Sequence, residues 1–430
     1  MRVVTTAQPP GGALPEPPLP GRLEPVTAQG AHFAALADEL AARFWDRAAD
    51  HDRDGSFPAE NVADLVATRV IAVAVPERFG GLGVTSTLDL GVGLTRLARG
   101  CASTALGLNM HVAVCHNLSR RWQHLVDRGE DAAAERLGGQ LALLGTGEMI
   151  TCGPASEPGT NILHPELRAE AVEGGWALTG TKVFATFSPA ATVLAITARV
   201  DAPDGPRLAL AMVPVGTAGV RFCDDWDAIG VRASGSQTLR FDGAVVPRGL
   251  VRTLGPWGDW NEGWLDAFVT GTFGLAAPFC GVAEQAHHLA VAALAERRKG
   301  PSYGLLRERT EVQALVGANV GDLFACHGAL ERMGRRIDAL HAAHPGSVPT
   351  AEHHRIFAEL QTVKHFVTRT AIGVVDRCLT LSGGAGYLAT NPLGRLWRDV
   401  RAGPFMQPMS EVDGPIHAGR VALGADLTWA

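Results

Sequence analysis

The stretch GGAGYLATNPLGRLWRDVR at residues 383–401 is the most informative part of the sequence. It is one of four short motifs that follow one another along the chain. The other three are AVPERFGGLG at 74–83, ASEPGTN at 155–161 followed by GTKVFAT at 180–186, and GVRASGSQTLRFDGAVVP at 230–247. Each motif alone is moderately specific. Their order, and the kind of segment that surrounds each of them, therefore decide the fold.

Three kinds of sequence divide the chain. Residues 31–146 carry apolar side chains at helical spacing, as between Phe33 and Leu36. Residues 147–258 hold short runs of Val, Leu, Ile and Thr that Gly, Pro, Asp and Asn interrupt, which is typical of a small β-barrel or sandwich. Helical periodicity returns in long segments over 259–430. We expect an α+β fold with an N-terminal α-helical domain, a middle β-domain and a C-terminal four-helix bundle.

The first 30 residues differ from the rest. They hold seven prolines between Pro9 and Pro25, so we expect residues 1–30 to form an extended or disordered head. No charged stretch followed by an apolar run marks a secretory signal. The longest run that lacks both charged residues and histidine, 267–283, is shorter than the ~20 residues of a membrane span. It contains Pro278 and glycines, and it predicts a buried helix and no association with a membrane.

The composition excludes several classes of protein. Hydrophobic residues make up 46% of the 430 residues and charged residues 19%, which is enough apolar material for a large core. The net charge of −6 argues against a nucleic acid partner, which would select a basic surface. The seven cysteines form no CxxC pair, so we expect reduced, buried thiols and no metal site. These features predict a cytoplasmic protein.

The four motifs in their α–β–α setting resemble those of the acyl-CoA dehydrogenase superfamily, over about residues 31–425. The family carries a similar proline–glycine loop, a similar Glu-Pro motif with its following strand, and a similar double-glycine segment. The resemblance implies three domains, with a flavin between the β-domain and the bundle. It also implies a homodimer or homotetramer.

The resemblance further implies which residues contact the flavin ring. Ser156 stands where the family has a threonine whose hydroxyl reaches the flavin edge. Phe184 and Thr186 match a tryptophan and a threonine, so the ring of Phe184 would cover one face of the flavin and the hydroxyl of Thr186 would bond near N5. The alternative is that Phe184 and Thr186 are ordinary strand residues.

The phosphates of the flavin would be held elsewhere. Either Arg297 or Arg298 corresponds to the family arginine that pairs with a flavin phosphate. The alternative is a charge that complements the end of a helix. The backbone at Gly383 and Gly384 would approach the pyrophosphate of a flavin on the partner subunit. A threonine, Thr380, replaces the family's glutamine there, and we expect FAD, with FMN as the less favoured choice.

The sequence departs from the family at the carboxylate that removes the substrate's α-proton. Eight residues after Asp399 the family has glutamate, and this chain has Gln407, whose amide is no base near neutral pH. The other family position falls at 270–272 and carries no glutamate. This pattern indicates the oxygenase branch, in which an adduct of reduced flavin and O2 transfers oxygen to the substrate. Gln407 would then lie in an apolar, proline-kinked pocket wall.

Three further residues are candidates for contact with the substrate. His111 is the best candidate for a catalytic or substrate-orienting group, because histidine donates or accepts near neutral pH. Its alternative is a buried, hydrogen-bonded helix histidine. Arg232 and Ser234 could line the mouth of the substrate site or form a structural turn.

Three functions remain open from the sequence. The first is a flavin-dependent oxygenase acting on an aromatic or natural-product intermediate, which could be a CoA thioester, with a flavin reductase as a possible partner. The second is an acyl-CoA dehydrogenase with a relocated base. The third is a non-catalytic binding protein on the flavin fold.

Overall fold

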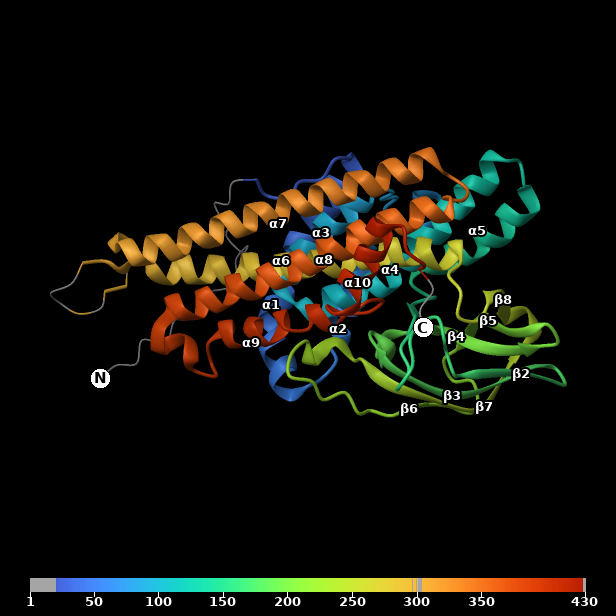
Figure 1. The fold of residues 1–430 in the computed structure, drawn as a ribbon. Helices are drawn as coiled ribbons and strands as arrows, with labels where there is room; N and C mark the ends of the chain where they lie inside the picture. Colours follow the sequence, from blue (N-terminus) through green and yellow to red (C-terminus); the bar gives the residue numbers. More distant parts are fainter. Residues whose placement is uncertain (1–20, 296, 299, 301–303, 428–430) are drawn as a thin grey trace.

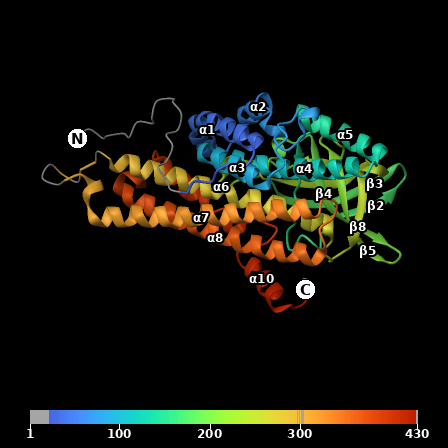
Figure 2. The same ribbon diagram turned by 90° about the horizontal axis from the view of Figure 1, so that it is seen from above.

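The chain runs from a helical region into a β-sheet and then into a second helical region, as Figure 1 shows. The computed structural model describes residues 21–295, 297, 298, 300 and 304–427. The two helical regions lie side by side, and the sheet lies at one end of them (Figures 1 and 2). Most of the proline-rich head, residues 1–20, lies outside the described residues. The expected α–β–α order is confirmed.

The first helical region contains α1 (Ala28–Asp54), α2 (Ala59–Ala67), α3 (Thr87–Gly100), α4 (Ala102–Asp127) and α5 (Asp131–Thr146). Helix α1 starts where the side chain of Thr27 accepts a hydrogen bond from the amide of Gly30, so it includes the last three residues assigned to the head. Its buried face contains Phe33 and Leu40, as the apolar spacing predicts. Helix α3 packs on both α1 and α6 and is therefore buried along most of its length.

The sheet contains β1 (Thr151–Cys152), β2 (Arg168–Val172), β3 (Gly175–Ala185), β4 (Val193–Ala202), β5 (Gly205–Pro214), β6 (Val220–Phe222), β7 (Gln237–Pro247) and β8 (Val251–Pro256). They pair in the order β6-β7-β3-β2-β4-β5-β8, with β1 beside β4. Strands β1 and β2 pair with β4 in parallel and the other pairs are antiparallel, so the sheet is mixed. The register of β3 on β7 shifts between Lys182 and Ala185, which marks a bulge at the end of β3.

The second helical region contains α6 (Glu262–Leu294), α7 (Thr310–Ala343), α8 (Thr350–Ser382), α9 (Pro392–Val400) and α10 (Asp413–Leu423). Helix α6 is central, because it packs on α3 and α4 as well as on α7 and α8. Glycines permit this approach: a Cβ at Gly281 would lie 2.0 Å from the carbonyl oxygen of Thr95. The expected bundle corresponds to α6, α7, α8 and α10, and the motif at 383–401 adds the short helix α9.

Helix α6 is long and apolar enough to cross a membrane by length and composition alone. Within the protein, 78% of its most apolar stretch is buried, as expected for the core helix of a bundle. The prediction that 267–283 forms a buried helix is therefore confirmed. Short 3₁₀ helices lie near the motifs: η4 (Arg232–Ser234), η7 (Gly383–Tyr387) and η8 (Gly403–Phe405).

Candidate active site

An exposed aromatic ring lies in the bulge at the end of β3. Phe184 has φ +56° and its side chain is 62% exposed. A positive φ is rare for a bulky residue, so the surrounding structure must hold this conformation. The ring of Trp226 packs edge-on against Phe184 at a centroid distance of 6.1 Å. Phe184 therefore presents an aromatic surface, as a flat cofactor requires.

Hydroxyl groups stand beside this ring. Thr186 Oγ1 lies 2.8 Å from Ser236 Oγ, and Ser234 Oγ lies 2.7 Å from the same atom. Ser156 joins them through its carbonyl, which accepts a main-chain hydrogen bond at 3.0 Å from the residue before Phe184. The structure thus gathers Ser156, Phe184, Thr186 and Ser234, and it adds Ser236, which the sequence analysis missed. We call this set the aromatic platform; its hydroxyls and ring suit the polar edge and the face of a flavin.

A buried ion pair lies behind the aromatic platform. Lys182 Nζ lies 2.5 Å from Glu157 Oε1 and 2.7 Å from Thr197 Oγ1. The second oxygen of Glu157 accepts hydrogen bonds from the amides of Glu166 and Leu167 at 2.7 and 3.0 Å. Burial lowers the pKa of Lys182 to about 8, although the charge of Glu157 opposes this shift. The pair joins two sequence motifs, and it explains why they occur together.

Arg232 binds backbone rather than facing open space. Its Nε donates to the carbonyl of Asp52 at 2.8 Å, and its Nη1 donates to Ala228 O at 2.9 Å and to Asp227 Oδ1 at 3.0 Å. These bonds tie the loop before η4 to the end of α1. They favour the alternative of a structural turn, and a contact between Arg232 and substrate stays a prediction.

The predicted phosphate-binding residues meet at the other end of the bundle. Arg297 Nη1 donates to the carbonyl of Ser382 at 2.5 Å, next to Gly383, which ends α8 with φ +56°. Arg298 is exposed and forms a β-bridge with Leu305 instead. Arg297 is thus bonded beside the double glycine, and a phosphate contact of either arginine stays a prediction. This end of the bundle, where α6 ends and α7 begins, points away from the sheet in Figure 1.

The segment that replaces the family's base lies between α9 and α10. Gln407 is exposed, whereas Pro408 and Met409 are buried. Lys364, on α8, donates to the carbonyl of Met409 at 2.6 Å and also to the carbonyl of Met406. Its side chain is buried, and burial lowers the pKa of Lys364 to about 7. The sequence analysis did not single out this lysine.

The carboxylates on α6 are all engaged elsewhere. Glu262 is exposed and accepts from Ser347 Oγ, and Glu284 is buried against His327 Nε2 at 2.7 Å. Asp266 accepts from Arg120 Nη1 at 2.9 and 3.0 Å. Burial opposes the charge of Asp266, but the imidazoles of His341 and His353, at 3.4 and 3.6 Å, and the charge of Arg120 hold its pKa well below the usual range.

His111 is fully buried between α4 and β1. Its Nδ1 accepts from the amide of Thr151 at 3.0 Å, and its Nε2 lies 3.3 Å from Cys115 Sγ. Burial lowers the pKa of His111 to about 4, so the ring is neutral near pH 7. This environment favours the alternative of a buried, hydrogen-bonded helix histidine, and a catalytic role for His111 stays a prediction.

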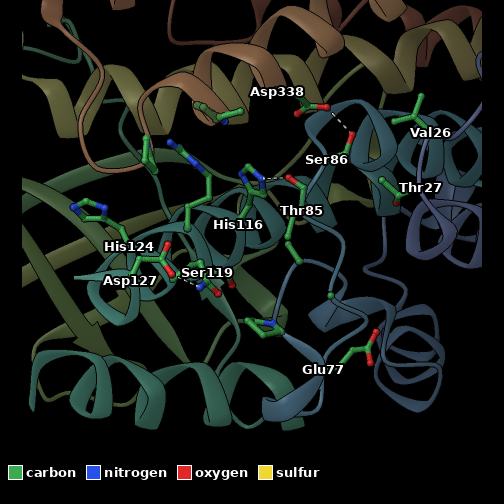
Figure 3. A pocket seen from close by; sticks show the side chains of 18 residues that line it. Val26, Thr27, Glu77, Thr85, Ser86, His116, Ser119, His124, Asp127 and Asp338 are labelled. Atoms are coloured by element: carbon green, nitrogen blue, oxygen red, sulfur yellow. Dashed lines mark hydrogen bonds between the residues drawn. The ribbon is translucent and has the colours of Figure 1, made fainter. Parts of the chain in front are cut away.

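A cavity of about 690 Å³ lies between α4, the loop before α3 and the end of α7 (Figure 3). His116 lines it and its Nε2 bonds the carbonyl of Thr85 at 2.9 Å, while Asp338 accepts from Ser86 Oγ at 2.6 Å. Burial, with the nearby charge of His341, lowers the pKa of His116 to about 4. The lining residues all come from the helical regions, so the cavity is separate from the aromatic platform. The residues that line the cavity are far apart in the sequence, so the sequence analysis did not group them.

A second polar cluster is buried between α6 and α7. Donor atoms of Cys280, Glu284 and His327 all lie within 4.8 Å of one another, and each side chain is at most 2% exposed. These are metal-ligating residue types that the sequence analysis did not group, since it expected no metal site. In the structure the hydrogen bond from His327 lowers the pKa of Glu284 against the effect of burial, so an internal bond already satisfies the carboxylate.

Comparison with known families gives three consecutive matches. The family models of the acyl-CoA dehydrogenase N-terminal, middle and C-terminal domains match residues 28–122, 153–244 and 273–408, respectively. These matches agree with the helical, sheet and helical regions of the structure.

Comparison with individual proteins gives relatives over nearly the whole chain. The amino sugar nitrososynthase DnmZ of Streptomyces peucetius is 32% identical, over 94% of this chain and 96% of that protein. The L-evernosamine nitrososynthase of a Micromonospora species is 33% identical, over 94% and 92%. The structure of KijD3 with FMN and a dTDP-linked 3-amino-4-keto sugar is 33% identical with a TM-score of 0.85, over 94% and 96%.

Proposed function

The chain belongs to the acyl-CoA dehydrogenase family, and from this premise we propose that it is a flavin-dependent N-oxygenase acting on the amino group of an amino sugar. Flavin-dependent oxidation of a small molecule, of the oxygenase type, is the broader class. The finer proposal rests on relatives that act on amino sugars and on one feature of this chain. That feature is the missing carboxylate: Gln407 and buried threonines occupy both family positions of the α-proton base.

The reaction balances without such a base. A bound, reduced flavin would supply two electrons, so that amine, dioxygen and reduced flavin give hydroxylamine, oxidised flavin and water. A second round would convert hydroxylamine to the nitroso product and release two waters. The chain's residues would position the reactants: Phe184 would cover one flavin face, and Ser156 and Thr186 would bond its edge. The amide of Gln407 can donate to or accept from the sugar without removing a proton from carbon.

Two observations favour different flavins. KijD3, a solved relative, holds FMN, whereas this chain keeps Arg297 beside Gly383, which suits the second phosphate that only FAD has. We propose FAD, held by the aromatic platform of one subunit and by Arg297, Gly383 and Gly384 of its partner in a homodimer.

This assignment predicts the effect of Arg297→Met. The variant should bind FAD on the order of tenfold to a hundredfold more weakly, because a guanidinium–phosphate pair is lost, and FMN binding should not change. Titration calorimetry with each flavin measures both affinities, with Arg298→Met as the matched control. Equal FAD affinities of wild type, Arg297→Met and Arg298→Met would contradict a contact between either arginine and a second phosphate.

The structure offers little support for a dehydrogenase with a relocated base. Asp266 is the carboxylate on α6 nearest the family position, and it is held ionised by Arg120, His341 and His353. A carboxylate stabilised in this way is a weak base. The family consists of enzymes. The alternative of a non-catalytic binding protein is therefore without a supporting observation.

A comparison of two classes of substrate tests the proposed function. The purified chain, loaded with flavin and supplied with a flavin reductase, is offered a dTDP-linked amino sugar and, separately, acyl-CoA esters. We expect the amino sugar to gain one oxygen as the hydroxylamine and then to lose two hydrogens as the nitroso product, and the acyl-CoA esters to stay unchanged. Flavin reduction by an acyl-CoA ester, with an α,β-unsaturated product, would overturn the proposal.

A further inference from the structure

Lys364 lies beneath the loop that replaces the family's base. Its side chain is 4% exposed, and its ammonium donates to the carbonyl oxygens of Met406 and Met409. These two carbonyls stand on either side of Gln407 and Pro408. One buried cation therefore holds both ends of a four-residue segment.

Other bonds also contribute to the order of this loop. Between α9 and α10 it has one turn of 3₁₀ helix, and the amide of Glu411 donates to Pro404 O at 2.9 Å. Phe405 is 76% exposed and Gln407 is also exposed, so the side chains that could meet a ligand point outward. The residues under them are fixed: Met409 is fully buried, and a Cβ at Gly403 would lie 2.6 Å from Thr368 Cγ2.

Backbone carbonyls accept the hydrogen bonds of the Lys364 ammonium, and the charged side chains nearby interact mainly with other groups. Asp413, at the start of α10, is the acidic group that favours the charged form, and its carboxylate also accepts from Ser410 Oγ at 2.6 Å. Glu411 pairs with Arg369, and His365 is the next residue on α8. Burial of an ammonium group costs free energy even when the group bonds carbonyls. This cost points to a role of Lys364 in ordering the loop.

We propose that Lys364 is a positioning residue of the active site, whose bonds to Met406 and Met409 hold Phe405 and Gln407 as a wall over the reacting edge of the flavin. This inference rests on the proposed function. Lys364 itself does not touch substrate. It keeps the loop closed, so that oxygen activated at the flavin reaches the amine instead of leaving as hydrogen peroxide.

Three variants of the full-length, flavin-loaded protein test the role. Lys364→Met removes the donor, Lys364→Gln keeps one donor of neutral charge, and Arg369→Met removes an exposed ion pair to the same loop as a matched control. Hydrogen–deuterium exchange over residues 405–411 reports the loop without any turnover. Reoxidation of reduced flavin with and without a dTDP-linked amino sugar gives peroxide release, kcat and KM.

We expect Lys364→Met to raise exchange over 405–411 about tenfold and to leave the sheet unchanged. Its kcat should fall on the order of tenfold to a hundredfold, with more peroxide per flavin oxidised. Lys364→Gln should be intermediate and Arg369→Met should match wild type. If Lys364→Met does not fold, Lys364→Gln decides the question.

Two results would overturn the role of Lys364. One is unchanged loop exchange in Lys364→Met, and the other is a mobile loop with unchanged kcat and peroxide release. Failure of wild type to oxidise the amino sugar would instead remove the proposed function. In that case loop exchange and the rate at which O2 reoxidises the reduced flavin without substrate still decide whether Lys364 holds a wall over the flavin.

Discussion

The two buried lysines of this chain differ in the groups that stabilise their charge. The sequence has three lysines, and the structure buries Lys182 in the sheet and Lys364 in the bundle. Lys182 has a carboxylate partner, Glu157, whereas Lys364 bonds two backbone carbonyls. The first lysine fixes strands behind the aromatic platform, and the second fixes a loop. The paired charge joins strands of the sheet, and the second charge joins two backbone carbonyls of one loop.

Removal of the paired lysine should have the larger effect on stability. In Lys182→Met, Glu157 keeps a buried negative charge without its cation, which costs about 3–5 kcal/mol of unfolding free energy. Urea unfolding of the apoprotein measures the loss, and the double variant Glu157→Gln with Lys182→Met should recover most of it. A loss below about 1 kcal/mol in Lys182→Met would show that the two lysines do not differ in this way.

Removal of the lone lysine should cost less. Lys364→Met leaves the carbonyls of Met406 and Met409 without a donor, but it also removes a buried charge. We expect a net loss on the order of 1 kcal/mol in the same urea experiment. A loss as large as that of Lys182→Met would mean that Lys364 supports the whole bundle and not the loop alone.

The pH dependence of stability gives the most specific difference between the two lysines. Burial lowers the pKa of Lys364 to about 7, whereas an unfolded lysine titrates near ~10.4. Between these values the unfolded chain binds more protons, so the contribution of Lys364 to stability rises with pH and is lost as pH falls through about 7. Wild type should therefore gain roughly 1 kcal/mol per pH unit relative to Lys364→Met between pH 7 and about 8.5. Parallel pH profiles would contradict the buried position of this amine.

Local patterns allowed the fold and part of the site to be predicted. Apolar spacing depends on neighbours in sequence, so the helical, sheet and helical regions and the buried α6 follow from it, and the motifs placed Ser156, Phe184 and Thr186 together. The expected family, the fold and the flavin-dependent oxygenase class are confirmed.

The remaining features depend on contacts between distant residues. Lys364 meets carbonyls 42 and 45 residues away, and Asp266 meets an arginine 146 residues away. No local pattern encodes such pairs, and buried polar groups look like surface groups in a sequence. The bond of Arg297 to the carbonyl of Ser382, 85 residues away, likewise needed the structure.

The source of the oxygen atom tests the central claim most directly. The flavin-loaded protein is reduced and given isotopically labelled dioxygen in ordinary water, together with a dTDP-linked amino sugar, and the product is weighed by mass spectrometry. We expect the labelled oxygen on the sugar nitrogen. Unlabelled product, or labelled oxygen found only in hydrogen peroxide while the amine stays intact, would contradict a flavin-dependent N-oxygenase.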